Sequence, residues 1–542
     1  MEKPFAITLD VGSSLANKTG AWRTERPVYL DRLPPCNAAC PAGENIQAWL
    51  FEAESGDYEA AWRSLVRDNP MPAVMGRVCY RPCQTACNRG KLDLPVGINS
   101  VEEFLGDEAI RRGWQFDLPQ QESGRKVMVV GAGPSGLSAA YHLRRLGHQV
   151  TICEAGPMAG GMMRFGIPKY RLPREVLDAE VARILAMGVE LQLNKRIDDL
   201  RGAMQAGGFD AVFLAIGAQR ARRAEIPAGG SAHVLDAVSL LRSMEGEEPP
   251  QIGRRVVIYG GGNTAIDVAR TARRLGAEEA IIVYRRNRER MPAHDFEVEE
   301  AIEEGVLMKW LSLIRDVDDS GTMTVEKVVL NEEGKPTPTG EYETLEADTL
   351  VLALGQEVDL SLLKGIAEIK ISDGVVEVDR QMMTGYAGIF AGGDMVPAER
   401  TVTVAIGHGK KAARNIDAWL RGERCEPPPK HEIAEFEKLN TWYYTDAPKT
   451  LRPMLDIVRR QTSFDEVVGQ LDESNALFEA RRCLSCGNCF ECDNCYGVCP
   501  DNAVIKLGPG KRFRFNYDYC KGCGICAAEC PCGAIKMVPE EI

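Results

Sequence analysis

Several features that would assign the protein to a familiar class are missing from its 542 residues. No apolar run reaches the roughly 20 residues that span a bilayer, so we expect no transmembrane helix. No long basic segment offsets the formal net charge of −13, which argues against a nucleic-acid partner. Residues 1–20 lack the basic and apolar segments of a signal peptide. We therefore expect a cytoplasmic protein. Cysteines stay free of disulfides in that reducing compartment.

Cysteine is almost absent from the middle of the chain. Five of the 18 cysteines lie between Cys36 and Cys87, and eleven lie between Cys483 and Cys532. Only Cys153 and Cys425 lie in the long segment that separates the two groups. In a reducing compartment, cysteines gathered in this way are better interpreted as metal ligands than as disulfides. The six histidines show no ligand spacing, so we expect cysteine-ligated metal at both ends of the chain.

A glycine-rich turn follows a strongly apolar strand expected over residues 126–130. The pattern Gly-x-Gly-x-x-Gly opens a helix here, and the next strand ends in an acid about 20 residues later. Its first glycine permits a tight turn, the second lets a pyrophosphate approach, and the third lets helix pack on strand. A turn that binds no ligand is the alternative. The pattern predicts an FAD site that contains Gly131, Gly133, Pro134, Ser135, Gly136 and Glu154.

A second segment supports flavin. Gly393 and Asp394 follow an expected strand at residues 388–391, and the Asp394 carboxylate suits the ribityl chain. A helix expected from about residue 401, which includes Thr403, would direct its positive N-terminus at the flavin pyrimidine ring.

A second glycine-rich turn repeats this design. The strand expected over residues 254–259 leads into a loop with the key positions Gly260, Gly262, Asn263, Thr264 and Ala265. The following strand ends in Arg285 and Arg286, where an acid would bind the free 2′-hydroxyl of NAD. Arginines favour the 2′-phosphate of NADP. The pattern predicts an NADP(H) site, with NAD(H) as the alternative.

The cysteine-poor middle then excludes one chemistry. Flavin reductases that act on disulfides need a redox-active cysteine pair near the flavin, and no cysteine lies between Cys153 and Cys425. Electrons must therefore leave the flavin by another route.

The C-terminal cysteines form two complete runs of the pattern C-x₂-C-x₂-C-x₃-C-P. This is the bacterial ferredoxin pattern, in which the fourth cysteine of each run ligates the other cluster. Zinc also uses paired cysteines, but two runs each closed by proline favour iron–sulfur. One cluster would take Cys489, Cys492, Cys495 and Cys530, and the other Cys520, Cys523, Cys526 and Cys499.

The N-terminal cysteine pattern over residues 36–41 and 76–87, with the segments 161–173, 260–267 and 284–292, resembles the glutamate synthase small-subunit family. That family includes the electron-input part of dihydropyrimidine dehydrogenase and flavin-based NADP:ferredoxin transhydrogenases. The resemblance covers about residues 30–425. It implies that Gly161 and Arg164 also contribute to cofactor binding.

The resemblance further implies two 4Fe-4S clusters near the N-terminus. One would be held by Cys40, Cys79, Cys83 and Glu102. The other needs a C-x₂-C pair upstream of Cys36, where this sequence has no cysteine.

The segment Arg481-Arg-Cys-Leu-Ser-Cys-Gly487, at the far end of the chain, resembles the missing piece. Our hypothesis is that Cys483 and Cys486 fold back and complete a cluster with Cys36 and Cys87. The alternatives are that a partner chain supplies the ligands or that this cluster is missing.

Together these patterns predict an α/β fold with two Rossmann-like domains, for FAD and NADP, flanked by a helical iron–sulfur domain and an α+β ferredoxin-like domain. We expect the following segments: the helical iron–sulfur domain at 1–122, the FAD domain at 123–252 and 351–425, the NAD(P) domain at 253–350, a helical connector at 426–480 and the ferredoxin-like domain at 481–542.

The expected function is electron transfer between NAD(P)H, FAD and four 4Fe-4S clusters, two N-terminal and two C-terminal. No residue is expected to act as a covalent catalyst. Without a substrate-processing domain, the chain needs a partner: a glutamate synthase large subunit, an oxidoreductase of oxo-acids or aldehydes, or a ferredoxin. A bifurcating NADP:ferredoxin transhydrogenase subunit and a cluster-bearing scaffold without nucleotide turnover are the alternatives.

Overall fold

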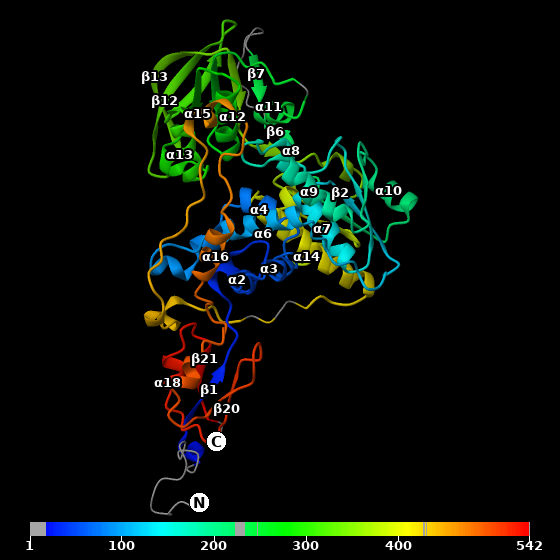
Figure 1. Ribbon diagram of the computed structural model, residues 1–542. Coiled ribbons are helices and arrows are strands. Elements are labelled where there is room, and N and C mark those ends of the chain that lie inside the picture. The colour runs from blue at the N-terminus through cyan, green and yellow to red at the C-terminus, as the bar shows by residue number, and fades with distance from the viewer. Residues whose placement is uncertain (1–17, 223–232, 247, 427–428, 430, 541–542) are drawn as a thin grey trace, which may run out of the picture.

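The computed structural model describes residues 18–222, 233–246, 248–426, 429 and 431–540. Figure 1 shows two α/β lobes, a helical domain that contacts them, and a small lobe near the C-terminus. Among the described residues, no helix combines the length and the apolar character needed to cross a bilayer.

The first α/β lobe contains a five-stranded parallel sheet in the order β18-β5-β2-β3-β4. Strand β2 is buried at every position after Lys126, as expected for a parallel strand that is covered on both faces. The strands are β2 (Lys126–Val130), β3 (Gln149–Cys153), β4 (Glu190–Gln192), β5 (Ala211–Leu214) and β18 (Ile389–Ala391). The helices are α7 (Pro134–Arg145), α8 (Met162–Phe165), α9 (Arg174–Leu185), α10 (Leu200–Gly207) and α14 (Val402–Arg421).

The second lobe repeats the architecture, with a parallel sheet in the order β10-β9-β8-β14-β7. Its strands are β7 (His233–Asp236), β8 (Arg255–Tyr259), β9 (Glu279–Val283), β10 (Leu307–Lys309) and β14 (Thr349–Leu352). Its helices are α11 (Ala237–Ser243), α12 (Asn263–Arg274) and α13 (Asp295–Glu303). A three-stranded antiparallel sheet is attached, formed by β11 (Ser312–Val317), β12 (Thr322–Leu330) and β13 (Pro336–Glu346).

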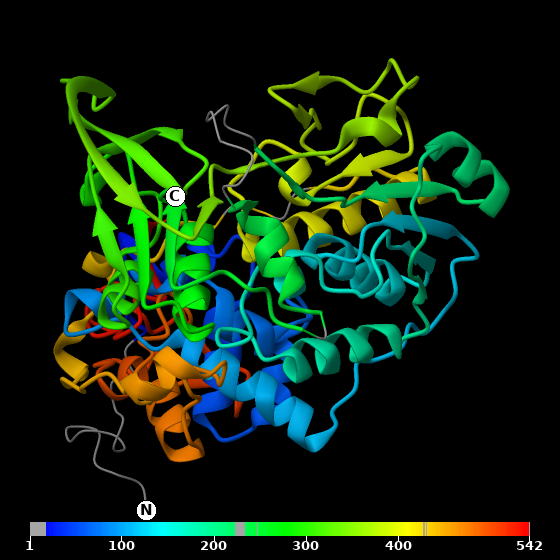
Figure 2. The same ribbon diagram turned by 90° about the horizontal axis from the view of Figure 1, so that it is seen from above.

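These strand pairings correct the boundaries expected between the two lobes. Strand β7 lies before residue 253 and β14 extends past residue 350, yet both belong to the second sheet. The sequence signal of the second lobe was its glycine loop, and an edge strand such as β7 carries no comparable motif. Figure 2 shows the two lobes side by side from above.

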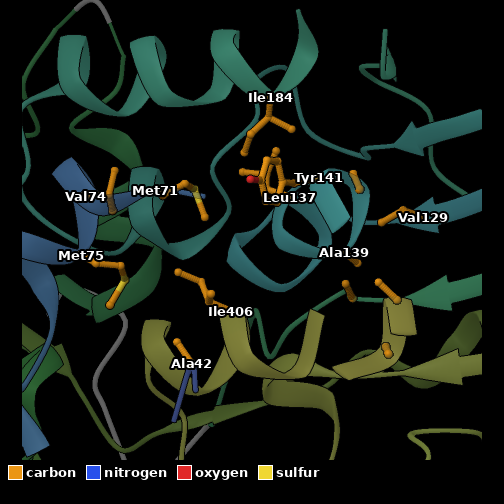
Figure 3. Packing of buried hydrophobic residues seen from close by; sticks show 14 of the residues in the cluster. Ala42, Met71, Val74, Met75, Val129, Leu137, Ala139, Tyr141, Ile184 and Ile406 are labelled. Carbon is orange, nitrogen blue, oxygen red and sulfur yellow. The ribbon is translucent and has the colours of Figure 1, made fainter. Parts of the chain in front are cut away.

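The N-terminal domain is helical, as expected, and packs directly on the first lobe. Its helices are α1 (Pro35–Ala39), α2 (Ile46–Glu54), α3 (Tyr58–Leu65), α4 (Pro72–Val78), α5 (Pro82–Thr85) and α6 (Ile98–Arg112). Met71 and Val74 pack with Leu137 of α7 and Ile406 of α14 in one continuous hydrophobic cluster (Figure 3). Burying each such side chain stabilises the folded state by about 1.5–3 kcal/mol. Because the cluster contains residues of both domains, the two domains share a core.

The C-terminal lobe consists of short elements around the cysteine runs. They are α17 (Asn494–Gly497), β19 (Val504–Lys506), β20 (Phe513–Phe515), α18 (Ile525–Ala528) and β21 (Ile535–Pro539). Strand β1 (Glu25–Tyr29) pairs antiparallel with β21, and Tyr29 stacks on Phe515 at 4.7 Å between ring centroids. Residues 25–29 were expected in the N-terminal domain, but they complete the C-terminal lobe because β21 offers them a free edge.

The segment expected to be a helical connector is mostly irregular. It contains α15 (Ile457–Thr462) and α16 (Glu473–Arg481), joined by extended chain. This segment contacts three domains: Arg452 donates to the Gly76 carbonyl at 3.0 Å, Arg460 pairs with Glu304 at 3.1 Å, and Val467 donates to Tyr170. Polar contacts distributed in this way replace the continuous apolar stripe that a long helix would need.

A buried arginine fixes the point where the C-terminal lobe begins. Arg482 is only 2% exposed, and its guanidinium pairs with Glu479 and Asp93, each at 3.0 Å. It also donates to the carbonyl oxygens of Leu94, Pro95 and Ala447. Every N–H group of Arg482 is therefore directed at the N-terminal domain, α16 or the connector.

Replacing Arg482 should loosen this junction. In Arg482→Met, the fully buried Glu479 carboxylate loses its counter-charge, at a cost of about 3–5 kcal/mol. We expect limited trypsin digestion to release the C-terminal lobe faster than in the unchanged protein. Arg481→Met is the matched control, because Arg481 is exposed. Equal release rates for the two variants would contradict the assigned role.

Candidate functional site

Two adjoining cavities, of about 630 Å³ and 340 Å³, lie along the first glycine loop. Both are lined by Gly131, Glu154 and Gly161. Cavities of this size at the carboxyl ends of parallel strands are typical of a large dinucleotide site.

The glycines of this loop have the geometry that such a ligand requires. Gly131 has a φ of 108°, and a Cβ there would lie 2.4 Å from the Ala215 carbonyl oxygen. Gly136 packs against Gly131, since a Cβ at Gly136 would lie 1.9 Å from the Gly131 carbonyl oxygen. Gly133 is different, because a Cβ there would meet only the Gly161 Cα atom, at 3.9 Å. The space beside Gly133 is thus open for a pyrophosphate.

Polar groups around the loop also fit a dinucleotide. The Glu154 carboxylate accepts hydrogen bonds from the backbone N–H groups of Ala132 at 2.8 Å and Gly156 at 2.7 Å, which hold it beside the cavity. The Ser135 hydroxyl is buried at the start of α7, next to Pro134, and has no hydrogen-bond partner in the described residues. A buried polar atom without a partner is rare, and a bound phosphate would supply one.

The second flavin segment lies in the smaller cavity. Gly393, Asp394 and the first turn of α14 line it. Burial raises the pKa of the Asp394 carboxyl group. A buried carboxyl group needs a hydrogen-bond partner, and a ligand in this cavity would supply one.

Two residues expected to bind cofactor lie elsewhere. Val402 and Ala405 of α14 face the cavity, whereas Thr403 points to the other side of the helix and donates to the Cys79 sulfur at 3.2 Å. Helical periodicity separates these side chains. Arg164 donates to the Ala159 carbonyl at 2.7 Å and pairs with Asp178. A guanidinium with these partners supports the 159–161 turn instead of a ligand.

The second glycine loop faces the first one. Asn263 and Thr264, in the first turn of α12, line the smaller cavity together with Gly133. Gly260 is confined by the Ala353 carbonyl oxygen, 2.3 Å from a Cβ built there, while Gly262 has no atom within 4 Å. Ala265 is completely buried. The loop therefore has the same open second position as the first.

The predicted arginine pair follows β9, beside this loop. Gly260 donates to the Val283 carbonyl at 3.1 Å, at the end of β9. Among the described residues, Arg285 and Arg286 form no ion pair with a carboxylate, whereas nearby Arg288 pairs with Glu299 at 2.9 Å. The buried Nε atom of Arg286 has no partner in the described residues. Two arginines without carboxylate partners suit a phosphate.

A buried ion triad joins the two lobes at this cavity. Arg171, from the first lobe, pairs with Asp267 of α12 at 2.9 Å and with Glu297 of α13 at 2.5 Å. The sequence did not single out this triad, because Arg171 is 96 residues from Asp267 and farther still from Glu297. Asp267 also lines the cavity, so the triad sets the position of the second loop relative to the first.

The N-terminal ligand set Cys40, Cys79, Cys83 and Glu102 comes together within the helical domain. Burial first, then the neighbouring Cys79, Cys40 and Glu102, raise the pKa of the Cys83 thiol. Burial raises the pKa of Cys79 to about 11. Such thiols lose their protons readily only to a metal, so the set fits an iron–sulfur cluster.

A second carboxylate, missed in the sequence, lies beside this set. Asn69 donates to Glu102 at 2.8 Å and to Glu44 at 3.1 Å. Burial raises the pKa of Glu44 to about 7. Glu44 is not part of a recognisable ligand motif, although Cys40-Pro41 lies a few residues before it. Spacing along the chain therefore did not reveal it.

The four cysteines of the fold-back hypothesis line one pocket. Cys36 and Cys87 enter it from the N-terminal domain, and Cys483 and Cys486 enter it from the start of the C-terminal lobe. Burial, then the neighbouring Cys483, Cys87 and Cys486, raise the pKa of Cys36. The N-terminal domain and the start of the C-terminal lobe therefore meet at this group of thiols.

The ferredoxin-type runs also interleave as expected. Cys499 lines a single pocket with Cys520, Cys523 and Cys526. Burial and the neighbouring Cys489, Cys530 and Cys492 raise the pKa of Cys495 to about 11. Among the described residues, no three His, Cys, Asp or Glu side chains lie at distances suited to a single metal ion. The thiols of Cys499, Cys520, Cys523 and Cys526 instead line a pocket.

Two facing dinucleotide loops with cysteine-rich domains at both ends define a nucleotide-binding flavoprotein fold. A family model described as pyridine nucleotide-disulphide oxidoreductase matches residues 125–409, and the chain belongs to that family. Models for dihydropyrimidine dehydrogenase domain II, 4Fe-4S cluster, and for a 4Fe-4S binding domain match residues 21–114 and 513–536. The expected fold class, and 4Fe-4S domains at both ends, are confirmed.

Curated relatives agree with this assignment. The chain is 35% identical over 497 residues to the NADP(+)-dependent formate dehydrogenase subunit beta of Moorella thermoacetica, covering 83% of this chain and 70% of that one. It is 33% identical to the NADPH-Fe(3+) oxidoreductase subunit beta of Geobacter sulfurreducens, covering 84% and 76%. It is 32% identical to the glutamate synthase [NADPH] small chain of Escherichia coli, covering 71% and 89%. The resemblance to the glutamate synthase small-subunit family is thereby confirmed.

The two open glycines allow a matched test of the loops. Both have extended backbones, with φ of −79° at Gly133 and −89° at Gly262, which valine tolerates. We expect Gly133→Val to be purified without flavin, because its side chain fills the pyrophosphate space. We expect Gly262→Val to keep its flavin but to resist bleaching by NADPH. Visible absorption spectra check both outcomes, and flavin retained by Gly133→Val would contradict the assignment of the first loop.

Proposed function

We propose that this chain is the NADP(H)-linked electron-transfer subunit of a larger oxidoreductase. Bound FAD would supply the exchange between the two-electron chemistry of NADPH and the one-electron chemistry of iron–sulfur clusters. The residues of the chain bind and orient the two nucleotides, exclude water between them and hold the cluster ligands. No side chain is needed as a nucleophile, and every step is reversible.

The observation that carries this proposal is the position of Cys79. Its neighbours Val78 and Tyr80 line the cavity between the two glycine loops. The sulfur itself accepts a hydrogen bond from Thr403 in the first turn of α14. A cluster ligand this close to the flavin cavity gives electrons an exit, which a flavin core without a cysteine pair requires.

Four clusters form the proposed route away from the flavin. Helices α1 and α5 lie between the two N-terminal groups: Cys36 and Cys40 are at opposite ends of α1, while Cys83 and Cys87 are separated by one turn. Cys486 is then only three residues from Cys489 of the C-terminal lobe. Successive ligand groups are thus linked by short pieces of chain.

The proposed acceptor, or donor, is a catalytic partner subunit or a ferredoxin. Two of the relatives are named beta subunits and a third is named a small chain, which supports a partner. Cys492 and Cys523 in the C-terminal lobe are exposed, so the last clusters would lie where a partner can approach. Formate dehydrogenase and glutamate synthase large subunits, or oxo-acid and aldehyde oxidoreductases, are the partner classes to test.

A bifurcating transhydrogenase is the second candidate function. It would require two acceptors of different potential and a second flavin in a partner. A scaffold without nucleotide turnover would leave two features without a role: the open Gly262 loop, and Arg285 and Arg286, which form no ion pair within the described part of the chain. This disfavours the scaffold.

Removal of the arginine pair tests the nucleotide assignment. We expect NADPH to reduce a viologen dye through the purified protein faster than NADH does. In Arg285→Ser/Arg286→Ser, the KM for NADPH should rise about 30-fold, since two charged hydrogen bonds to phosphate are lost, while the KM for NADH changes little. Arg288→Ser is the matched control, because Glu299 already pairs with Arg288. An unchanged preference for NADPH in the double variant would exclude the pair as the phosphate site.

The fold-back cluster has its own test. In Cys483→Ser/Cys486→Ser we expect loss of about a quarter of the iron and sulfide, because one of four proposed clusters loses two ligands. Cys425→Ser, which removes a thiol outside the four groups, should keep the full content. An unchanged iron content in the double variant would contradict the hypothesis that Cys483 and Cys486 ligate a cluster.

A further inference from the structure

The two residues that follow Cys79 contact the nucleotide lobe, although they lie between cluster ligands in the chain. The Tyr80 hydroxyl accepts a hydrogen bond from the Asn263 side-chain amide at 2.7 Å. Its ring stacks on His294, with 3.7 Å between centroids and 24° between planes. The Arg81 guanidinium lies 4.7 Å from the ring centroid of Phe296. Tyr80 and Arg81 thus bridge two domains.

Both ends of the Asn263 side chain are occupied. Its amide nitrogen donates to Tyr80, and its oxygen accepts from the backbone N–H of His294 at 3.0 Å. This pattern fixes the orientation of the amide. Without the Tyr80 hydroxyl, Asn263 would be held from one side only.

Asn263 is the first residue of α12, and its restraint matters for ligand binding. The residue before it, Gly262, offers no side chain to cap the helix. The first N–H groups of α12 are therefore left for a ligand, and such groups bind phosphates. The orientation of this first turn decides where those groups point.

The backbone at this bridge is strained. Arg81 has a φ of 61°, in the left-handed region, which is unfavourable for a residue other than glycine. Surrounding contacts must hold such a conformation, and it often marks a functional position. Here it lies where the chain passes from the Tyr80 contact into α5, which carries Cys83.

We propose that Tyr80, supplied by the N-terminal iron–sulfur domain, is a positioning residue of the nicotinamide-nucleotide site. It holds Asn263 and the first turn of α12 in the orientation that receives the pyrophosphate of the nucleotide. This inference rests on the proposed function of the second glycine loop as the nucleotide site.

Tyr80→Phe is the decisive variant, since it keeps the ring on His294 and removes only the hydroxyl. We expect the dissociation constant for NADP⁺, measured by titration calorimetry on the flavin- and cluster-loaded protein, to rise about fivefold. In viologen reduction, the KM for NADPH should rise while kcat changes little. The flavin and iron contents should stay unchanged.

Tyr141→Phe is the matched control. Tyr141 donates from its hydroxyl to the Val66 carbonyl of the N-terminal domain at 2.6 Å, far along the sequence from the second loop, and its loss should leave NADP⁺ affinity unaltered. Asn263→Ala and the double variant Tyr80→Phe/Asn263→Ala complete a cycle. We expect the effects to be non-additive, because both residues act through one hydrogen bond.

The outcomes separate this inference from the function on which it rests. If the unchanged protein fails to bind NADP⁺, the proposed function is wrong. If it binds NADP⁺ and Tyr80→Phe binds within twofold of it, or the two substitutions add independently, the role of Tyr80 is overturned. If Tyr80→Phe loses its cofactors, Asn263→Ala decides, because unchanged affinity there also overturns the proposal.

Discussion

The buried guanidinium of Arg482 is the contact on which the arrangement of the two chain ends depends. It pairs with Asp93 of the N-terminal domain and with Glu479 of α16, immediately before Cys483. Leaving the buried Glu479 carboxylate without its counter-charge would be strongly unfavourable, so the chain is held at this point. The thiols of Cys483 and Cys486 consequently reach the pocket of Cys36 and Cys87. The pairing of β1 with β21 closes the junction from the other side.

A second buried ion group, Arg171 with Asp267 and Glu297, plays the same part for the nucleotide lobe. It holds α12 and α13 against the first lobe, so that the two glycine loops share a cavity. Arg460 reinforces the arrangement from the connector, where it pairs with Glu304. Burial alone would raise the pKa of Glu304, but hydrogen bonds from Arg270 and Arg274 lower it to about 2. The carboxylate thus stays charged at neutral pH, and the lobe stays attached.

The sequence predicted what depends on local spacing. The glycine loops, the strand ends and the interleaved cysteine runs are short motifs whose geometry is set by neighbouring residues. It did not predict the contacts of Thr403 and Arg164, since the first depends on which face of α14 meets the cavity and the second on how α9 brings Asp178 to the turn. It also missed Glu44 and Tyr80. Their positions follow from how domains pack, and no spacing along the chain encodes that.

The family to which this chain belongs is named for disulphide chemistry, yet its flavin core has no cysteine pair. The cysteines expected to ligate clusters instead lie in domains attached to either end, and among them Cys79 is flanked by Val78 and Tyr80, which line the smaller cavity. Electron transfer needs proximity but no bond between donor and acceptor, so a domain can replace a disulfide if it is held rigidly. The shared hydrophobic core of the N-terminal domain and the first lobe provides that rigidity. A hinged contact would let the distance from Cys79 to the cavity fluctuate, and the core of Met71, Val74, Leu137 and Ile406 prevents it.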